Sequence, residues 1–249
     1  MTSLGTTGKD IEGPEKNSNC GIHHWSRHGI AGRGVLIDYW TYANETGKFY
    51  GMCSSSSGCG NLSQISPEKF LHKDANLIPD PYDYHTIPFS ELLACGKAQG
   101  IDIRPASQGG NIQIGDLLFI RSGFISTYYT KTPDERAAAA LRPHALGTED
   151  GQRWAGIKQE EAMIDWLHDC YFAAVAGDAP SFEAWPSHES YMLHEYILAM
   201  WGMPLGEMFD LEALSQNCKE KGRWTFFVTS CPSNCTGGVS SHGNAMAIF

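Results

Sequence analysis

The sequence predicts a single α/β domain, on three observations. Segments with the patterns of helices and of strands alternate through the middle of the chain, which is typical of α/β proteins. The chain has 249 residues, which suffices for one large α/β domain or two small ones. Hydrophobic residues make up 42% of the sequence and charged residues 18%, so a sizeable core is expected.

The outer limits of this domain follow from composition. Residues 1–19 are polar, rich in Gly, Ser and Lys and without periodicity, which predicts a flexible arm. The domain itself is expected over 20–249. Residues 51–80 carry neither a helical nor a strand period, so we predict an irregular insertion there. The insertion is either a surface loop or the translation of an unspliced intron, and we favour the second interpretation.

Strands are expected where short apolar runs follow turn residues. In the first, glycines precede the apolar residues Val35, Leu36 and Ile37, and Asp38 follows at the end of the run. Asp178 stands just past the end of another buried run. The predicted strands are 32–40, 112–124, 171–181, 223–230 and 244–249.

Helices are expected where apolar residues recur at helical spacing between capping residues. Ser90 is the predicted N-cap of a helix over 89–100. Thr132, followed by Pro133 and Glu135, predicts a capping box at the start of the next helix. Met163, Trp166, Leu167 and Cys170 share one face of a third helix, over 158–170.

The stretch LHEYILAMWGMPLGE, residues 193–207, carries two groups that could hold a metal, His194 and Glu207. One continuous helix would turn these side chains well away from each other. Gly202 and Pro204 instead predict that the helix ends near Trp201. Once the chain reverses there, Glu207 is free to fold back toward His194.

Charge and hydropathy exclude several classes of partner. The formal net charge of −10 argues against nucleic acid and anionic membranes, which both require a basic surface. No apolar run reaches the eighteen or more residues of a membrane span, and the N-terminus lacks a signal peptide's apolar core. We therefore expect a cytoplasmic protein. For the pairs Cys53/Cys59 and Cys231/Cys235 we expect reduced thiols rather than disulfides or zinc ligands.

The order of several segments resembles the cyclase family, which includes bacterial kynurenine formamidase and related metal-dependent hydrolases, and in particular its fungal branch. The resemblance covers most of 20–249 except 51–80. The segments are GIHHWSRHGIAGRGVLIDYW, ACGKAQGIDIRP, GDLLFIRSGF, WAGIKQEEAMIDWLHDCYFAAVAGDAPSFEAWP, LHEYILAMWGMPLGEM and GGVSSHGNAMAIF.

This resemblance implies a mixed sheet in a swivelling β/β/α architecture around a metal site. In such enzymes zinc or manganese activates a water molecule that attacks the carbonyl of an amide, ester or lactone. His194 and Glu207 match the two late metal ligands of the family. The alignment with the family needs a shift of one residue between these two positions.

The family's signature, a His-x-Gly-Thr-His-x-Asp stretch, has no counterpart before the strand at 32–40. His23, His24 and His28 lie there without an interleaved acid, and they are weak candidates for catalytic residues. We therefore expect the chain to lack the front part of such a domain. Two ligands are too few for a catalytic zinc, so metal binding is expected to be poor or absent.

Three further residues stand at the ends of buried strands. Asp178 either faces the site as a catalytic residue or caps the next turn. Arg121 and Ser122 either bind a carboxylate of the substrate or pair with a neighbouring acid.

These residues support three hypotheses. The first is a hydrolase that uses metal-activated water on a small molecule of secondary metabolism. The alternatives are a non-catalytic binding or oligomer-partner relative, and a metal-free lyase or isomerase that uses acid–base groups. Sheet edges left unpaired by a missing front part predict a homo-oligomer.

Overall fold

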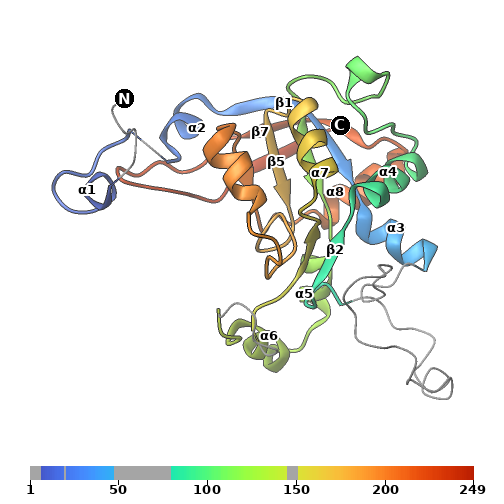
Figure 1. Ribbon diagram of the computed structural model, residues 1–249, viewed down its shortest axis with the longest axis horizontal. Coiled ribbons are helices and arrows are strands. Elements are labelled where there is room, and N and C mark those ends of the chain that lie inside the picture. Colours follow the sequence, from blue (N-terminus) through green and yellow to red (C-terminus); the bar gives the residue numbers. More distant parts are fainter. Residues whose placement is uncertain (1–6, 20, 48–79, 145–150) are drawn as a thin grey trace.

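The structure, a computed structural model, describes residues 7–19, 21–47, 80–144 and 151–249 (Figure 1). Its strands are β1 (Ile30–Ile37), β2 (His85–Ile87), β3 (Leu117–Ile120), β4 (Ala155–Ile157), β5 (Ala174–Gly177), β6 (Leu205–Gly206), β7 (Thr225–Ser230) and β8 (Ala245–Ile248). Its α-helices are α1 (Gly8–Ile11), α2 (His23–His28), α3 (Tyr39–Thr46), α4 (Phe89–Ala98), α5 (Phe124–Thr130), α6 (Pro133–Ala140), α7 (Glu161–Asp169) and α8 (Glu212–Lys221). A 3-10 helix, η3 (Ala106–Gln108), and a π-helix, η4 (Glu195–Met200), complete the elements.

The main sheet is mixed, as the family resemblance implies. Its strand order is β6-β5-β3-β1-β7-β8. The first four strands are parallel to one another, whereas β7 pairs antiparallel with both β1 and β8. A second, two-stranded parallel sheet joins β2 to β4. The architecture is thus a single α/β domain with a mixed sheet.

The central strands are apolar on both faces because both faces are covered. On one face Val35, Leu118 and Val175 join a core with side chains from α4 and α7. Successive side chains of a strand point to opposite faces, so Leu36 and Phe119 join a second core that includes residues of α8. Helix α7 buries Met163, Trp166 and Leu167, with Cys170 next to them, as predicted.

The register places polar residues side by side at the carboxyl end of the parallel strands. Ile37 lies opposite Ile120, and Ile120 opposite Gly177. The residues that follow these positions, Asp38, Arg121 and Asp178, therefore share one edge of the sheet. This is the edge at which parallel sheets most often bind ligands.

The expected N-cap at Ser90 is wrong. Helix α4 begins at Phe89 with Pro88 as its N-cap, so that Ser90 lies inside the first turn. The Glu160 carboxylate accepts a hydrogen bond from the Phe89 N–H at 2.8 Å, which supplies the capping partner from a distant part of the chain. The capping box predicted at Thr132 is present.

The arm contains α1, which the sequence did not predict. Asn17 accepts a hydrogen bond from the Gly237 N–H at 3.0 Å, so the arm contacts the segment that leads into β8. The insertion predicted at 51–80, with Cys53 and Cys59, lies almost wholly outside the described residues. In the described part of the chain no helix is long and apolar enough to cross a membrane.

Candidate active site

His194 and Glu207 meet in space. His194 Nε2 lies 3.0 Å from Glu207 Oε1. The reversal expected after Trp201 is present, since η4 ends at Met200 and Gly202 has a φ of 64°. The chain then enters β6, whose Gly206 pairs with Ala176 of β5, and Glu207 follows at the carboxyl end of the strand. The predicted convergence of the two side chains is confirmed, while their metal role stays a prediction.

A second carboxylate, Glu183, holds the other side of the imidazole. Glu183 Oε2 lies 2.7 Å from His194 Nδ1, and Glu183 Oε1 accepts the His194 backbone N–H at 3.4 Å. Glu207 is held as well, because its Oε1 accepts the Phe182 N–H at 3.0 Å. The imidazole is therefore fixed between two carboxylates that are themselves fixed by the backbone.

Glu183 owes its place to close backbone packing against β4. The Ala184 N–H donates to the Ile157 carbonyl at 3.1 Å. A Cβ on Gly156 would lie 2.4 Å from the Glu183 carbonyl carbon, so only glycine allows this approach. Sequence reasoning missed Glu183. Its position among the apolar residues of SFEAW was the available signal, since a carboxylate buried there needs a partner.

The three groups differ in access to solvent. The side chains of His194 and Glu207 are each 28% exposed, whereas that of Glu183 is 2% exposed. Burial alone would lower the pKa of His194, but the hydrogen bonds to Glu183 and Glu207 outweigh it and raise the pKa to about 10. In the absence of a metal the imidazole is thus protonated at neutral pH.

The donor set fits part of a metal site. An imidazole nitrogen and a carboxylate oxygen are donors that zinc and manganese accept. Histidine ligands also hold a carboxylate on their second nitrogen, as His194 holds Glu183. Within the described ranges, however, no group of three His, Cys, Asp or Glu side chains is arranged to hold a metal.

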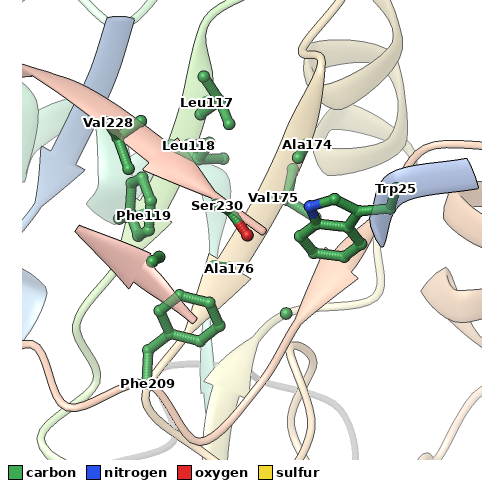
Figure 2. Close-up of a pocket in the computed structure, with 12 residues that line it drawn as sticks. Trp25, Leu117, Leu118, Phe119, Ala174, Val175, Ala176, Phe209, Val228 and Ser230 are labelled. Atoms are coloured by element: carbon green, nitrogen blue, oxygen red, sulfur yellow. The ribbon is translucent and has the colours of Figure 1, made fainter. Parts of the chain in front are cut away.

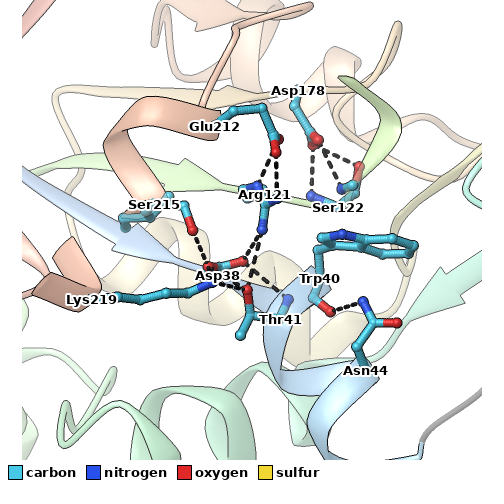
Figure 3. Close-up of polar contacts among 12 residues, drawn as sticks. Asp38, Trp40, Thr41, Asn44, Arg121, Ser122, Asp178, Glu212, Ser215 and Lys219 are labelled. Atoms are coloured by element: carbon cyan, nitrogen blue, oxygen red, sulfur yellow. Dashed lines mark hydrogen bonds and ion pairs between the residues drawn. The ribbon is translucent and has the colours of Figure 1, made fainter. Parts of the chain in front are cut away.

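Arg121 belongs to a buried ion network at the ends of β1 and β3 (Figure 3). Its Nη1 donates to Asp38 Oδ1 at 2.8 Å. Its Nε and Nη2 donate to the two oxygens of Glu212 at 2.8 and 2.6 Å. Ser215 and Lys219 of α8 also contact Asp38 Oδ2. The pairing with neighbouring acids is therefore present, and substrate binding by Arg121 stays a prediction.

Asp178 anchors the turn after β3. Its carboxylate accepts hydrogen bonds from the Ser122 N–H, the Ser122 hydroxyl and the Gly123 N–H, at 2.6 to 2.8 Å. The residue is fully buried, and burial raises the pKa of its carboxyl group. This geometry is that of the turn-capping alternative for Asp178, and it engages Ser122 as well. Their catalytic and substrate-binding roles stay predictions.

The three histidines of α2 are not brought to this site. His23 is buried and its Nδ1 lies 2.7 Å from Asn234 Oδ1, while His24 and His28 are exposed. Helix α2 precedes the amino end of β1, whereas Glu207 follows the carboxyl end of β6. Among the described residues no hydrogen bond or ion pair joins an α2 histidine to His194 or Glu207.

A small apolar cavity lies on the face of the main sheet that carries the second core, where Trp25 lines it together with residues of β3, β5 and β7 (Figure 2). Phe119, Ala176, Phe209 and Val228 are among the residues that line it. Its volume is about 20 Å³, enough for one water molecule at most, so it is a packing defect rather than a substrate site.

Comparison with known proteins identifies the fold. No family model matches the sequence, and no curated protein does. Among solved structures, the chain is similar to a crystal structure described as that of a novel cyclase, with a TM-score of 0.66 and 22% sequence identity. The match covers 98% of this chain and 63% of the other chain. The chain therefore has a cyclase-like fold and spans somewhat less than two thirds of that neighbour's length.

Proposed function

We propose that the chain is a cyclase-like hydrolase that acts on an amide, ester or lactone of a small molecule. The observation that carries this proposal is the 3.0 Å approach of His194 Nε2 to Glu207 Oε1. These side chains come from two elements, stand at the carboxyl edge of the parallel strands and remain partly exposed. Ligand sites are common at this edge.

His194 and Glu207 would hold the divalent ion, zinc or manganese. When bound, such an ion polarises a carbonyl group and lowers the pKa of water to about 7. Glu183 keeps the imidazole oriented with Nε2 toward Glu207, and the Phe182 N–H keeps Glu207 in place, so these two side chains would be positioned to hold the ion. Catalytic zinc takes three protein ligands, and the described residues offer two. We therefore expect weak binding and slow turnover.

Metal titration tests this proposal directly. Protein purified without chelator is titrated with Zn²⁺ and Mn²⁺ and its metal content is measured by elemental analysis. His194→Ala and Glu207→Ala are expected to lose the bound metal. His168→Ala is the matched control, because His168 is an exposed histidine whose one acidic partner among the described residues is Asp169. A parent protein that takes up no metal, or site variants that bind as much as the parent, would contradict the proposal.

A metal-free lyase or isomerase is the second candidate, and the contacts of His194 favour it. Both ring nitrogens lie within hydrogen-bond distance of a carboxylate, an arrangement that can move a proton between a substrate and Glu207. Turnover that persists in excess chelator and is lost in Glu207→Gln would support this candidate over the hydrolase.

A further inference from the structure

Strand β8 stands at one end of the main sheet, and among the described residues no strand pairs with its outer edge. It is the last strand in the order β6-β5-β3-β1-β7-β8. Met246 is 63% exposed and Ile248 46% exposed, and Phe227 of the neighbouring strand is exposed beside them. At the opposite end of the sheet, β6 is only two residues long. The long apolar edge is therefore at β8.

The backbone of β8 has hydrogen-bonding groups directed away from β7. The Cys231 N–H donates to the Asn244 carbonyl, and the antiparallel register continues from this pair to Phe227 opposite Ile248. Hydrogen-bonded and non-hydrogen-bonded pairs alternate along such a ladder. The N–H and C=O groups of Ala245 and Ala247 therefore point outward. In the part of the chain that the structure describes, no hydrogen bond beyond the β7–β8 pair engages them.

Nothing in the sequence of β8 blocks this edge. Natural edge strands are usually protected by a charge, a proline or a bulge. The strand Ala-Met-Ala-Ile contains none of these.

We propose that the β8 edge pairs with the β8 edge of a second copy, antiparallel and about a two-fold axis at Ala247. An antiparallel pair of identical strands is its own complement, which suits an isologous dimer. In this register Ala247 lies opposite Ala247, so small side chains meet at the axis. Met246 of each copy lies opposite Ile248 of the other, so both exposed apolar side chains become covered. This proposal is independent of the proposed enzymatic function.

Light scattering after size-exclusion chromatography, over a series of protein concentrations, tests the pairing. Ala247→Pro removes the outward N–H of both copies, and the loss of two hydrogen bonds weakens the dimer by about 30-fold. Met246→Lys places a charge on each side of the axis and is expected to have a similar effect while keeping the backbone. Met200→Lys, an equally exposed methionine on η4, is the matched control and should dimerise like the parent.

Amide hydrogen exchange gives a second readout. The Ala247 amide is expected to exchange slowly only at concentrations where the dimer forms. The Met246 amide faces β7 and should be protected at every concentration. A parent that stays monomeric, or a dimer that survives both β8 variants with Ala247 still exchanging rapidly, overturns the proposal.

Discussion

Replacement of Arg121 by methionine separates a structural role from a role in substrate binding. Methionine has a similar length without the charge, so the main loss is electrostatic. Asp38, whose side chain is 1% exposed, would lose its 2.8 Å partner and keep Lys219 at 3.5 Å, the Thr41 N–H at 3.2 Å and two hydroxyl groups. Removal of one partner of a buried ion pair costs about 3 to 5 kcal/mol. Glu212 is 26% exposed, and water would partly replace its lost bonds.

We therefore expect Arg121→Met to lower the free energy of unfolding by about 4 kcal/mol, measured by urea titration at pH 7. Asp38→Asn supplies a double-mutant cycle. Because the double variant removes both partners, its loss should be smaller than the sum of the single losses by about 2 kcal/mol. A loss below about 1 kcal/mol for Arg121→Met, combined with a raised KM, would refute this reasoning and would restore Arg121 as a substrate-binding residue.

Three further predictions concern stability. Burial lowers the pKa of His85 to about 4, so the unfolded chain takes up this proton first as the pH falls. Between pH 8 and pH 5 His85 should therefore lower the free energy of unfolding by about 2 kcal/mol, while the raised pKa of His194 acts in the opposite direction, so the His85 part is measured as the difference between the parent and His85→Gln in urea titrations at both pH values. Thr132→Ala removes the cap of α6 and should cost about 1 kcal/mol, seen as faster hydrogen exchange in that helix. Gly123 has a φ of 94°, and a Cβ added there would lie 2.3 Å from the Trp40 ring. Gly123→Ala should therefore lower the free energy of unfolding by about 3 kcal/mol, measured by thermal unfolding. Its matched control is Gly222→Ala, whose added Cβ meets no atom within 4 Å, so the backbone strain alone should cost about 1 kcal/mol.

Local signals were sufficient for about half of the elements of this fold, including β1, β3, β5, β7 and β8 of the main sheet, but α3, α5 and α8 were not predicted. The apolar run before Asp178, the capping box at Thr132 and the glycine after Trp201 all act within one turn or one strand, so the sequence predicts their consequences directly. Ser90 shows the opposite case. A good capping residue was available in the sequence, yet the Glu160 carboxylate from the start of α7 satisfies the Phe89 N–H instead. A tertiary contact of this kind leaves no trace at the position where the helix begins.

The residues of the candidate site also differ in whether local sequence predicts them. His194 and Glu207 were predictable because the bend between them depends on Gly202 and Pro204, which lie in the same short stretch. Glu183 was not, because its approach to His194 depends on the packing of its backbone against Gly156 of β4. That contact is a property of the assembled sheet rather than of either segment.

The carboxyl edge of the parallel strands explains why the proposed site rests on one pair of side chains. Asp38, Arg121, Asp178 and Glu207 directly follow the adjacent strands β1, β3, β5 and β6. The first three are buried and satisfied within the fold, either in the ion network with α8 or at the turn after β3. Glu207 is the one of these four that stays partly exposed, and it does so beside an equally exposed imidazole. Of the polar groups at this edge, the His194–Glu207 pair is therefore the one we propose for ligand binding, because Asp38, Arg121 and Asp178 are engaged in contacts that stabilise the fold.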